Sequence, residues 1–212
     1  MGSVKQCGRI VTDKVKKEMI TSMNKSEKEK REFLYSLCET NKGDIMLSGL
    51  IGKSGKLADA GIELSANKLR KACQSKGGKV IGDFHTHPFV HSKENLGEEA
   101  KDVYVSGGDI MHLDVLSKEL KTNFTGCIGG KIKKNGVLVN RVRCFDNDTI
   151  RPFVRETAIK MNGNVGGNVF GFSRNKKKRK ISQSEYDKAA QETAYILDEQ
   201  HKGDNFSCRN DF

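Results

Sequence analysis

Two histidines have the type and spacing of metal ligands. His85 and His87 follow a strand-like segment, residues 79–84. Residues two apart in a strand point to the same side, so the two imidazoles should project together. Pro88 cannot donate a hydrogen bond to a neighbouring strand and should end this strand. The pair could therefore bind one metal ion, although a His-x-His sequence also fits an ordinary strand end.

The third candidate ligand is Asp109, in the sequence Ser106-Gly107-Gly108-Asp109 at the predicted start of a helix. This pattern also fits a purely structural role, with Ser106 as the N-cap and Asp109 three residues later. A helix N-terminus, however, presents free backbone N–H groups and the positive end of the helix dipole, which suits a site that stabilises anions. The two roles are compatible.

Together these motifs resemble the JAMM/MPN (Mov34, JAB) zinc metalloprotease family, in particular its prokaryotic or archaeal deubiquitinase-like members. The family motif is an upstream Glu, then His-x-His-Pro, then Ser-x-x-Asp at a helix start. The resemblance spans about residues 10–145. It implies an α/β (α+β) fold of three layers, cytidine-deaminase-like, with a mixed central β-sheet flanked by helices. The loop of residues 88–105 is longer than is usual in the family.

The resemblance also implies a cofactor and a reaction. His85, His87 and Asp109 would bind Zn²⁺ and leave one position for water, whose pKa falls from about 15.7 to about 7 on zinc. The implied reaction is hydrolysis of an isopeptide or peptide bond at the C-terminus of a ubiquitin-like modifier. Its extended tail would pair beside a sheet edge.

The catalytic residues implied by the resemblance are a glutamate and a serine. Glu39 best matches the upstream Glu and would act as general acid/base, although its spacing to Gly43 is looser than the family motif. Glu63, closer to His85, is the rival. Ser106 would donate a hydrogen bond to the oxyanion.

Three nearby residues have two interpretations each. Asp83 either supports the metal ligands from outside the coordination shell or has a plain surface role. His112 is a candidate extra ligand, but it also fits a satisfied helical histidine. Cys127 fits a free thiol packed as a small hydrophobic group.

Hydrophobic periodicity predicts the elements that position these residues. Residues 13–38 should be helical in two pieces, with Ser26 and Glu29 as a capping box ahead of Phe33, Leu34 and Leu37 in the core. Further helices are expected at residues 66–76 and Gly107–Leu120. Strands are expected at residues 44–52, 62–64, 79–84, 124–130 and 137–145, with Asn135-Gly136 as a hairpin turn.

The domain organisation follows from a change of composition after residue 150. Residues 1–150 should form the JAMM/MPN-like metalloprotease domain, 151–182 a Gly/Asn-rich and basic linker, and 183–212 a C-terminal helix (about 183–199) with a polar tail. Of the formal net charge of +11, the dense part is residues 174–180, from Arg174 to Lys180 (RNKKKRK). This run could make a weak nucleic-acid contact but fits a solvated segment better.

The cysteines and the apolar segments indicate the compartment. Six cysteines without a CxxC pair exclude a zinc ribbon and fit reduced thiols in a cytoplasmic protein, although an even number leaves disulfides open. No apolar segment reaches membrane-spanning length, so we expect no membrane contact.

Two other functional classes remain open from the sequence. Asp83-Phe84-His85-Thr86-His87 also resembles the DxHxH opening of amidohydrolase and PHP-type barrels. Few histidines follow it to supply the later ligands of such a barrel. The other class is a non-catalytic MPN-type interaction scaffold, which normally lacks the metal ligands.

Overall fold

A single mixed sheet of six strands organises the described part of the chain. The structure is a computed structural model that describes residues 10–53, 65–88, 103, 105, 107–148, 150, 188 and 207–212. The strand order is β2-β1-β3-β4-β5-β6. The strands are β1 (Phe33–Thr40), β2 (Ile45–Lys53), β3 (Gly78–His87), β4 (Thr125–Lys134), β5 (Val137–Asp146) and β6 (Ser207–Asp211).

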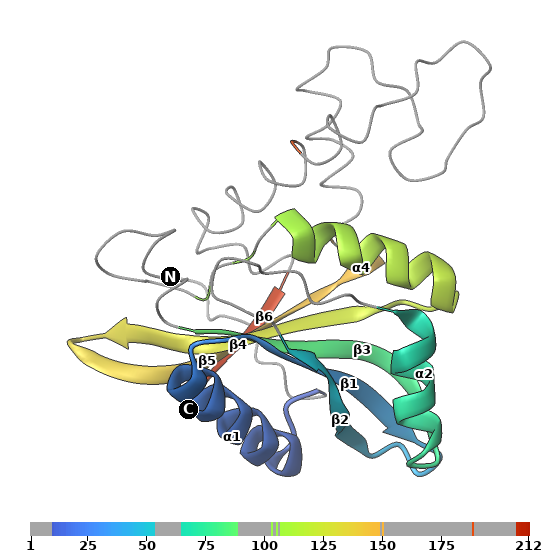
Figure 1. Cartoon of the computed structure of the whole chain (residues 1–212), viewed down its shortest axis with the longest axis horizontal. Coiled ribbons are helices and arrows are strands. Elements are labelled where there is room, and N and C mark those ends of the chain that lie inside the picture. The colour runs from blue at the N-terminus through green and yellow to red at the C-terminus, as the bar shows by residue number, and fades with distance from the viewer. Residues whose placement is uncertain are drawn as a thin grey trace.

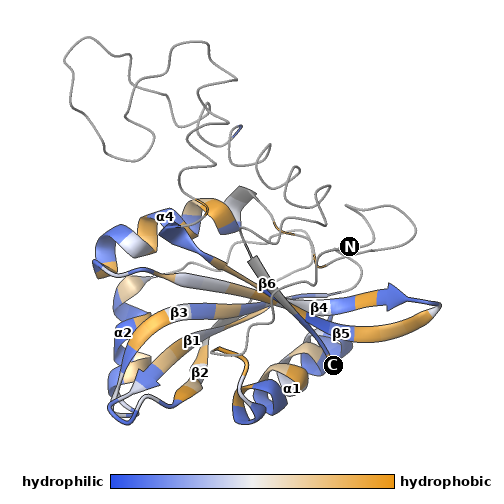
Figure 2. Cartoon of the chain, turned by 180° about the vertical axis from the view of Figure 1, so that it is seen from behind, coloured by the Kyte–Doolittle hydropathy of each residue, from blue (hydrophilic) through white to orange (hydrophobic). Residues whose placement is uncertain are grey.

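The helices cover both faces of this sheet, so the fold has three layers (Figure 1). They are α1 (Asp13–Glu29), α2 (Ala66–Gln74) and α4 (Gly107–Leu120). Helix α1 lies on one face, while α2 and α4 lie on the other. Figure 2 shows hydrophobic and hydrophilic residues interspersed along α1 and α4, as expected for helices with one face against a sheet. The predicted mixed sheet flanked by helices is confirmed.

Each face of the sheet has its own hydrophobic core. The core under α1 contains Val15, Met19, Met23, Leu37, Phe84 and Val142. The core under α2 and α4 contains Leu69, Ile110, Leu113, Leu116, Phe124, Ile128 and Phe145. Because Phe84 points to the α1 core, its neighbours Asp83 and His85 point to the α4 side. The alternation of β3 therefore directs the candidate ligands to the face that carries α4.

The prediction of helix over residues 13–38 is wrong in its second half. Helix α1 ends at Glu29, Lys30 takes a left-handed conformation, and the chain then enters β1. Ser26 lies inside the helix and donates to the carbonyl of Arg31 instead of capping a second helix. The predicted core residues Phe33, Leu34 and Leu37 are nevertheless buried, because β1 lies between helical layers and is covered on both faces.

The connection between β3 and β4 brings α4 to the site. These two strands are parallel, and a parallel pair needs a crossover, which here contains α4. The crossover starts after the last residue of β3 and enters α4 at its N-terminus. The N-terminal turn of α4, predicted correctly together with its end at Leu120, lies near the end of β3 that carries His85 and His87, since its Asp109 is 3.0 Å from His85.

The β4–β5 hairpin agrees with the turn prediction. Asn135 and Gly136 both have positive φ, 51° and 79°, as a two-residue primed turn requires. The hairpin projects beyond the helices (Figures 1 and 2) and exposes Val137 and Leu138.

Part of the predicted polar tail joins the domain. Residues 207–211 form β6, which pairs antiparallel with β5. Besides this backbone pairing, Asp211 accepts two hydrogen bonds from Arg141, of 2.6 and 2.9 Å, and the polar sequence of the strand gave no signal of it. The predicted strand at 62–64, the linker 151–182 and, apart from Lys188, the helix 183–199 lie outside the described residues.

Four cysteines form disulfides, contrary to the expectation of reduced thiols. Cys38 of β1 is bonded to Cys73 of α2, and Cys127 to Cys144 across β4 and β5. Cys127 is thus not a free thiol, although it is fully buried as predicted. Its partner follows from the predicted Asn135-Gly136 hairpin, because the register of that turn places Cys127 directly opposite Cys144. Among the described residues, no helix is long and apolar enough to cross a membrane.

Candidate metal centre

His85, His87 and Asp109 converge at the end of β3. One ligand atom from each residue lies within 4.8 Å of the others. Asp109 Oδ1 is 3.0 Å from His85 Nε2, and Asp109 Oδ2 is 3.8 Å from His87 Nε2. Donor atoms around a tetrahedral zinc ion are roughly 3.3 Å apart, given bonds of about 2.0–2.1 Å. The three side chains can therefore hold a metal ion.

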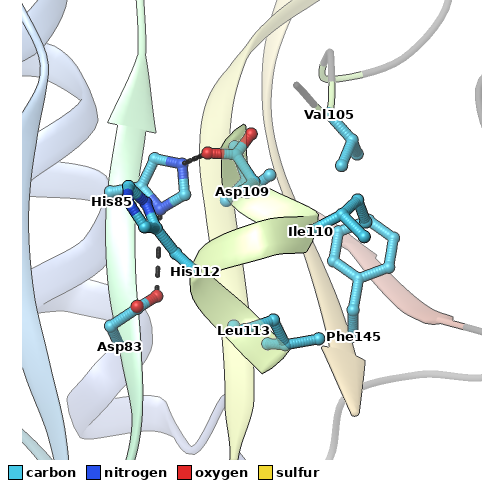
Figure 3. A pocket seen from close by; sticks show the side chains of 10 residues that line it. Asp83, His85, Val105, Asp109, Ile110, His112, Leu113 and Phe145 are labelled. Atoms are coloured by element: carbon cyan, nitrogen blue, oxygen red, sulfur yellow. Dashed lines mark ion pairs between the residues drawn. The ribbon is translucent and has the colours of Figure 1, made fainter. Parts of the chain in front are cut away.

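The surroundings of His85 fit such an ion. The ring is buried between two carboxylates, with Asp109 facing Nε2 and Asp83 Oδ1 3.8 Å from Nδ1 (Figure 3). Neither ring nitrogen makes a well-aligned hydrogen bond with a described residue. Burial by itself lowers the pKa of His85, but Asp109 and Asp83 together outweigh it and raise the pKa well above its usual value. The site thus attracts positive charge, either as a proton or as a cation.

Asp83 is a buried residue, which rules out the plain surface role. Its side chain is only 6% exposed and lies on the same face of β3 as His85. Burial raises the pKa of Asp83, and the hydrogen-bonding and charge interaction with His85 opposes this rise. A carboxylate on the Nδ1 side of the ring leaves Nε2 as the nitrogen available to a metal.

Glu32 is a site residue that the sequence prediction missed. It is 7% exposed, and its Oε1 lies 3.7 Å from His87 Nε2. The backbone next to Glu32 is held by a hydrogen bond, in which the N–H of Phe33 donates to Thr86 Oγ1 at 2.9 Å. Thr86 lies between the two histidines, so this bond joins the start of β1 to the ligand-bearing end of β3. A carboxylate beside the metal ligands can exchange protons with a bound water or substrate.

Glu39, predicted as the general base, lies elsewhere. It pairs in register with Lys79 near the opposite end of β3, and its Oε2 is 2.9 Å from Lys79 Nζ. The structure therefore does not bring Glu39 to the cluster. Glu39 was chosen because a helix was predicted to end just before it. The structure instead has β1 in this segment, and the glutamate near the ligands, Glu32, directly precedes that strand. Ser106 and Glu63 lie outside the described residues.

A pocket adjoins the cluster on the side of His85 and Asp109. It has a volume of about 350 Å³, including space open to solvent. Asp83, His85, Asp109 and His112 line its polar part (Figure 3). His112 lies one turn after Asp109 on α4, and burial lowers its pKa. It belongs to the pocket wall and not to the group of three ligands.

Comparison with known proteins finds no matching family model, no matching curated protein and no matching solved structure.

Proposed function

We propose that this chain is a zinc-dependent hydrolase of JAMM type that cleaves a peptide or isopeptide bond. The observation that carries the proposal is the convergence of two imidazoles and one carboxylate with a second, buried carboxylate, Glu32, beside them. Two nitrogen ligands favour zinc over magnesium or calcium, which prefer oxygen ligands. Three protein ligands with a free fourth position are typical of catalytic zinc.

The bound zinc would supply a nucleophile at neutral pH, by lowering the pKa of its water, and would polarise the substrate carbonyl. The protein's own contribution begins with Glu32, whose carboxylate accepts a proton and then delivers it to the leaving nitrogen. Glu32 takes over the role first assigned to Glu39, because of these two described glutamates it is Glu32 that lies beside the ligands. The Asp83 carboxylate, 3.8 Å from His85 Nδ1, would favour the proton on Nδ1 and so leave Nε2 available to a metal ion.

Ser106 retains its proposed role as oxyanion donor on the basis of sequence position alone, directly before α4. The proposed substrate is the C-terminal tail of a ubiquitin-like modifier or a peptide of similar extended form. The basic run 174–180 remains a candidate nucleic-acid contact, and a steep salt dependence of binding to DNA or RNA would reveal it.

The two alternative classes are less well supported. An amidohydrolase or PHP-type enzyme needs a barrel, whereas this sheet is an open row that runs from β2 to β6. A non-catalytic scaffold needs neither the three converging ligands nor the buried Glu32.

The compartment predicted from reduced thiols is not part of the proposal. Two disulfides favour an oxidising compartment, or a cytoplasm in which disulfides persist, as in hyperthermophiles. Peptide mapping of protein alkylated before denaturation should recover the Cys38–Cys73 and Cys127–Cys144 pairs.

The test of the proposed function is metal content together with hydrolysis. Native mass spectrometry of protein supplied with zinc should show one ion per chain. Internally quenched peptides and a peptide linked through a lysine side chain should be cleaved only by the zinc-loaded form. The His87→Ala variant is the matched control, and the chelated wild type is the second. A protein that binds zinc yet cleaves neither kind of bond would support the scaffold instead.

A further inference from the structure

Arg143 is a buried cation on the face of the sheet that carries the metal ligands. The residue is only 4% exposed. It lies two residues before Phe145 on β5, so both side chains point to the α4 side, and the Arg143 guanidinium lies 5.1 Å from the centre of the Phe145 ring. In register, Ile128 of β4 lies between Arg143 and His85. Because a buried charge is costly unless polar groups bind it, the groups that contact Arg143 need an explanation.

The guanidinium binds the chain just before α4. Its Nη1 group donates to the carbonyl of Val103 at 3.0 Å, in a buried hydrogen bond. Val103 is fully buried and packs against Gly130 of β4, since a Cβ atom on Gly130 would lie 3.5 Å from Val103 Cγ1. Gly130 pairs in register with His87. The segment that Arg143 holds therefore lies beside the ligand-bearing end of β3.

This hydrogen bond restrains the approach to Asp109. Asp109 follows Val103 by six residues, and α4 begins between them, at Gly107. Val105, just ahead of the first turn of α4 (Figure 3), is also fully buried and belongs to the core under α4. So short a segment, held at both valines, leaves the first turn of α4 little freedom. A hydrogen bond from a charged donor is stronger than one between neutral groups, so its loss should let this turn shift.

We propose that Arg143 is a positioning residue of the metal centre. Through the carbonyl of Val103 it holds the first turn of α4 where the Asp109 carboxylate meets the two histidines. This inference rests on the proposed zinc site and adds a residue that acts through Asp109 and not on the metal itself. Asp109 Oδ1 lies 3.0 Å from His85 Nε2, so a shift of the turn would open the ligand set. A misplacement of about 1 Å can cost roughly 10²-fold in rate.

The first experiment measures zinc affinity by competition with a chromophoric chelator. Arg143→Met keeps an apolar stem and removes the donor, so it should weaken zinc binding by about tenfold or more, as loss of a group that supports metal ligands does. Arg141→Met is the matched control. Arg141 is likewise 4% exposed and faces the same side of β5, but it binds Asp211 of β6, so this variant should keep the wild-type affinity. An unchanged affinity in Arg143→Met, or an equal loss in Arg141→Met, would overturn the inference.

A double-mutant cycle tests whether Arg143 acts through Asp109. In Asp109→Ala the carboxylate is already absent, so adding Arg143→Met should lower the remaining zinc affinity by less than about twofold. A residue that merely stabilises the fold would cost the same factor in both backgrounds. Calorimetry at high zinc concentration reaches the weaker affinities. Equal factors in the two backgrounds would therefore overturn the inference.

Folding and the proposed function are checked separately. Far-UV circular dichroism of each metal-free variant shows whether it folds. If Arg143→Met does not fold, Arg143→Gln, whose shorter polar side chain cannot reach the Val103 carbonyl, replaces it in both measurements with the same expected results. Zinc binding without cleavage would overturn the hydrolase and leave the inference standing. Zinc bound equally by the wild type and the Arg143 variant would overturn the inference alone, and a wild type that binds no zinc would overturn both.

Discussion

The carboxylate of Glu32 lies 3.7 Å from Nε2 of His87, whereas Glu39 at the other end of β1 is ion-paired with Lys79 at 2.9 Å. Glu32 directly precedes β1 and Glu39 lies near its end, but only the first lies beside the metal ligands. The relationship is fixed by the antiparallel pairing of β1 with β3, which places Leu34 opposite His85 and Glu39 opposite Lys79.

Exchange of these two glutamates for glutamine should separate their roles. Glu32→Gln keeps the shape of the side chain and removes its ability to carry a proton, so kcat should fall by about 10²–10⁴-fold while zinc content is unchanged. Glu39→Gln, the matched control, should keep nearly full activity. Steady-state kinetics with parallel metal analysis gives the answer. A large loss of kcat in Glu39→Gln alone would return the base to the residue first inferred from the motif.

Thr86 should control the position of Glu32. Thr86→Val keeps the volume of this fully buried side chain but leaves the Phe33 N–H without its acceptor. We expect a loss of stability of about 1–3 kcal/mol in urea unfolding and a lower kcat. Thr86→Ser keeps the hydroxyl and should recover most of both. If Val and Ser variants have the same kcat, the Thr86–Phe33 bond does not position the base.

Local signals in the sequence predicted much of the site. The alternation of β3 placed His85 and His87 on one side, and the start of α4 placed Asp109 at a helix N-terminus, as the structure has them. These features depend only on residues near one another in the chain. The convergence of the two segments needs the crossover from β3 to β4, which no local signal indicated; it was expected only from the resemblance to the JAMM/MPN motif.

Glu32 could not be found in the same way, because β1 does not alternate. Its register shifts twice against β2 and once against β3, and it is covered on both faces. Buried residues therefore occur in adjacent pairs, such as Phe33-Leu34 and Leu37-Cys38, and this spacing resembles that of a helix. The one signal for Glu32 in the sequence is its position directly before residues 33–38, a segment rich in residues that favour strands. The Cys38–Cys73 disulfide and β6 were missed because they depend on pairing between distant segments, whereas the Cys127–Cys144 pair was available from the register of the predicted hairpin.

Asp83 should tune the affinity for zinc. Asp83→Asn removes the charge that faces His85 Nδ1 and should weaken zinc binding by about 10–100-fold, the usual effect of losing such a partner. Competition with a chromophoric chelator measures the dissociation constant without any substrate. Asp44→Asn, an exposed acid on the loop before β2, is the control and should bind zinc like the wild type. An unchanged zinc affinity in Asp83→Asn would limit Asp83 to a packing role.

The ion pair of Asp211 with Arg141 should make the domain sensitive to acid. Burial by itself raises the pKa of Asp211, but hydrogen bonds from Arg141 and Lys134 outweigh it and hold the pKa below its usual value of 3.8. The folded state therefore favours the charged carboxylate. Its contribution to stability is fully present above the unfolded pKa and is lost as the pH falls through the lower folded pKa.

Unfolding by urea at several pH values between 7 and 2 should show this loss. Asp211→Asn should be less stable than the wild type at pH 7, and the difference in the free energy of unfolding should shrink as the pH falls below about 4. Arg141→Gln removes the main partner of Asp211, so adding Asp211→Asn to it should change the pH dependence much less. If the free energy of unfolding depends on pH in the same way in the wild type and in Asp211→Asn, the ion pair with Arg141 does not stabilise the charged form of Asp211. Another interaction would then anchor the C-terminal strand.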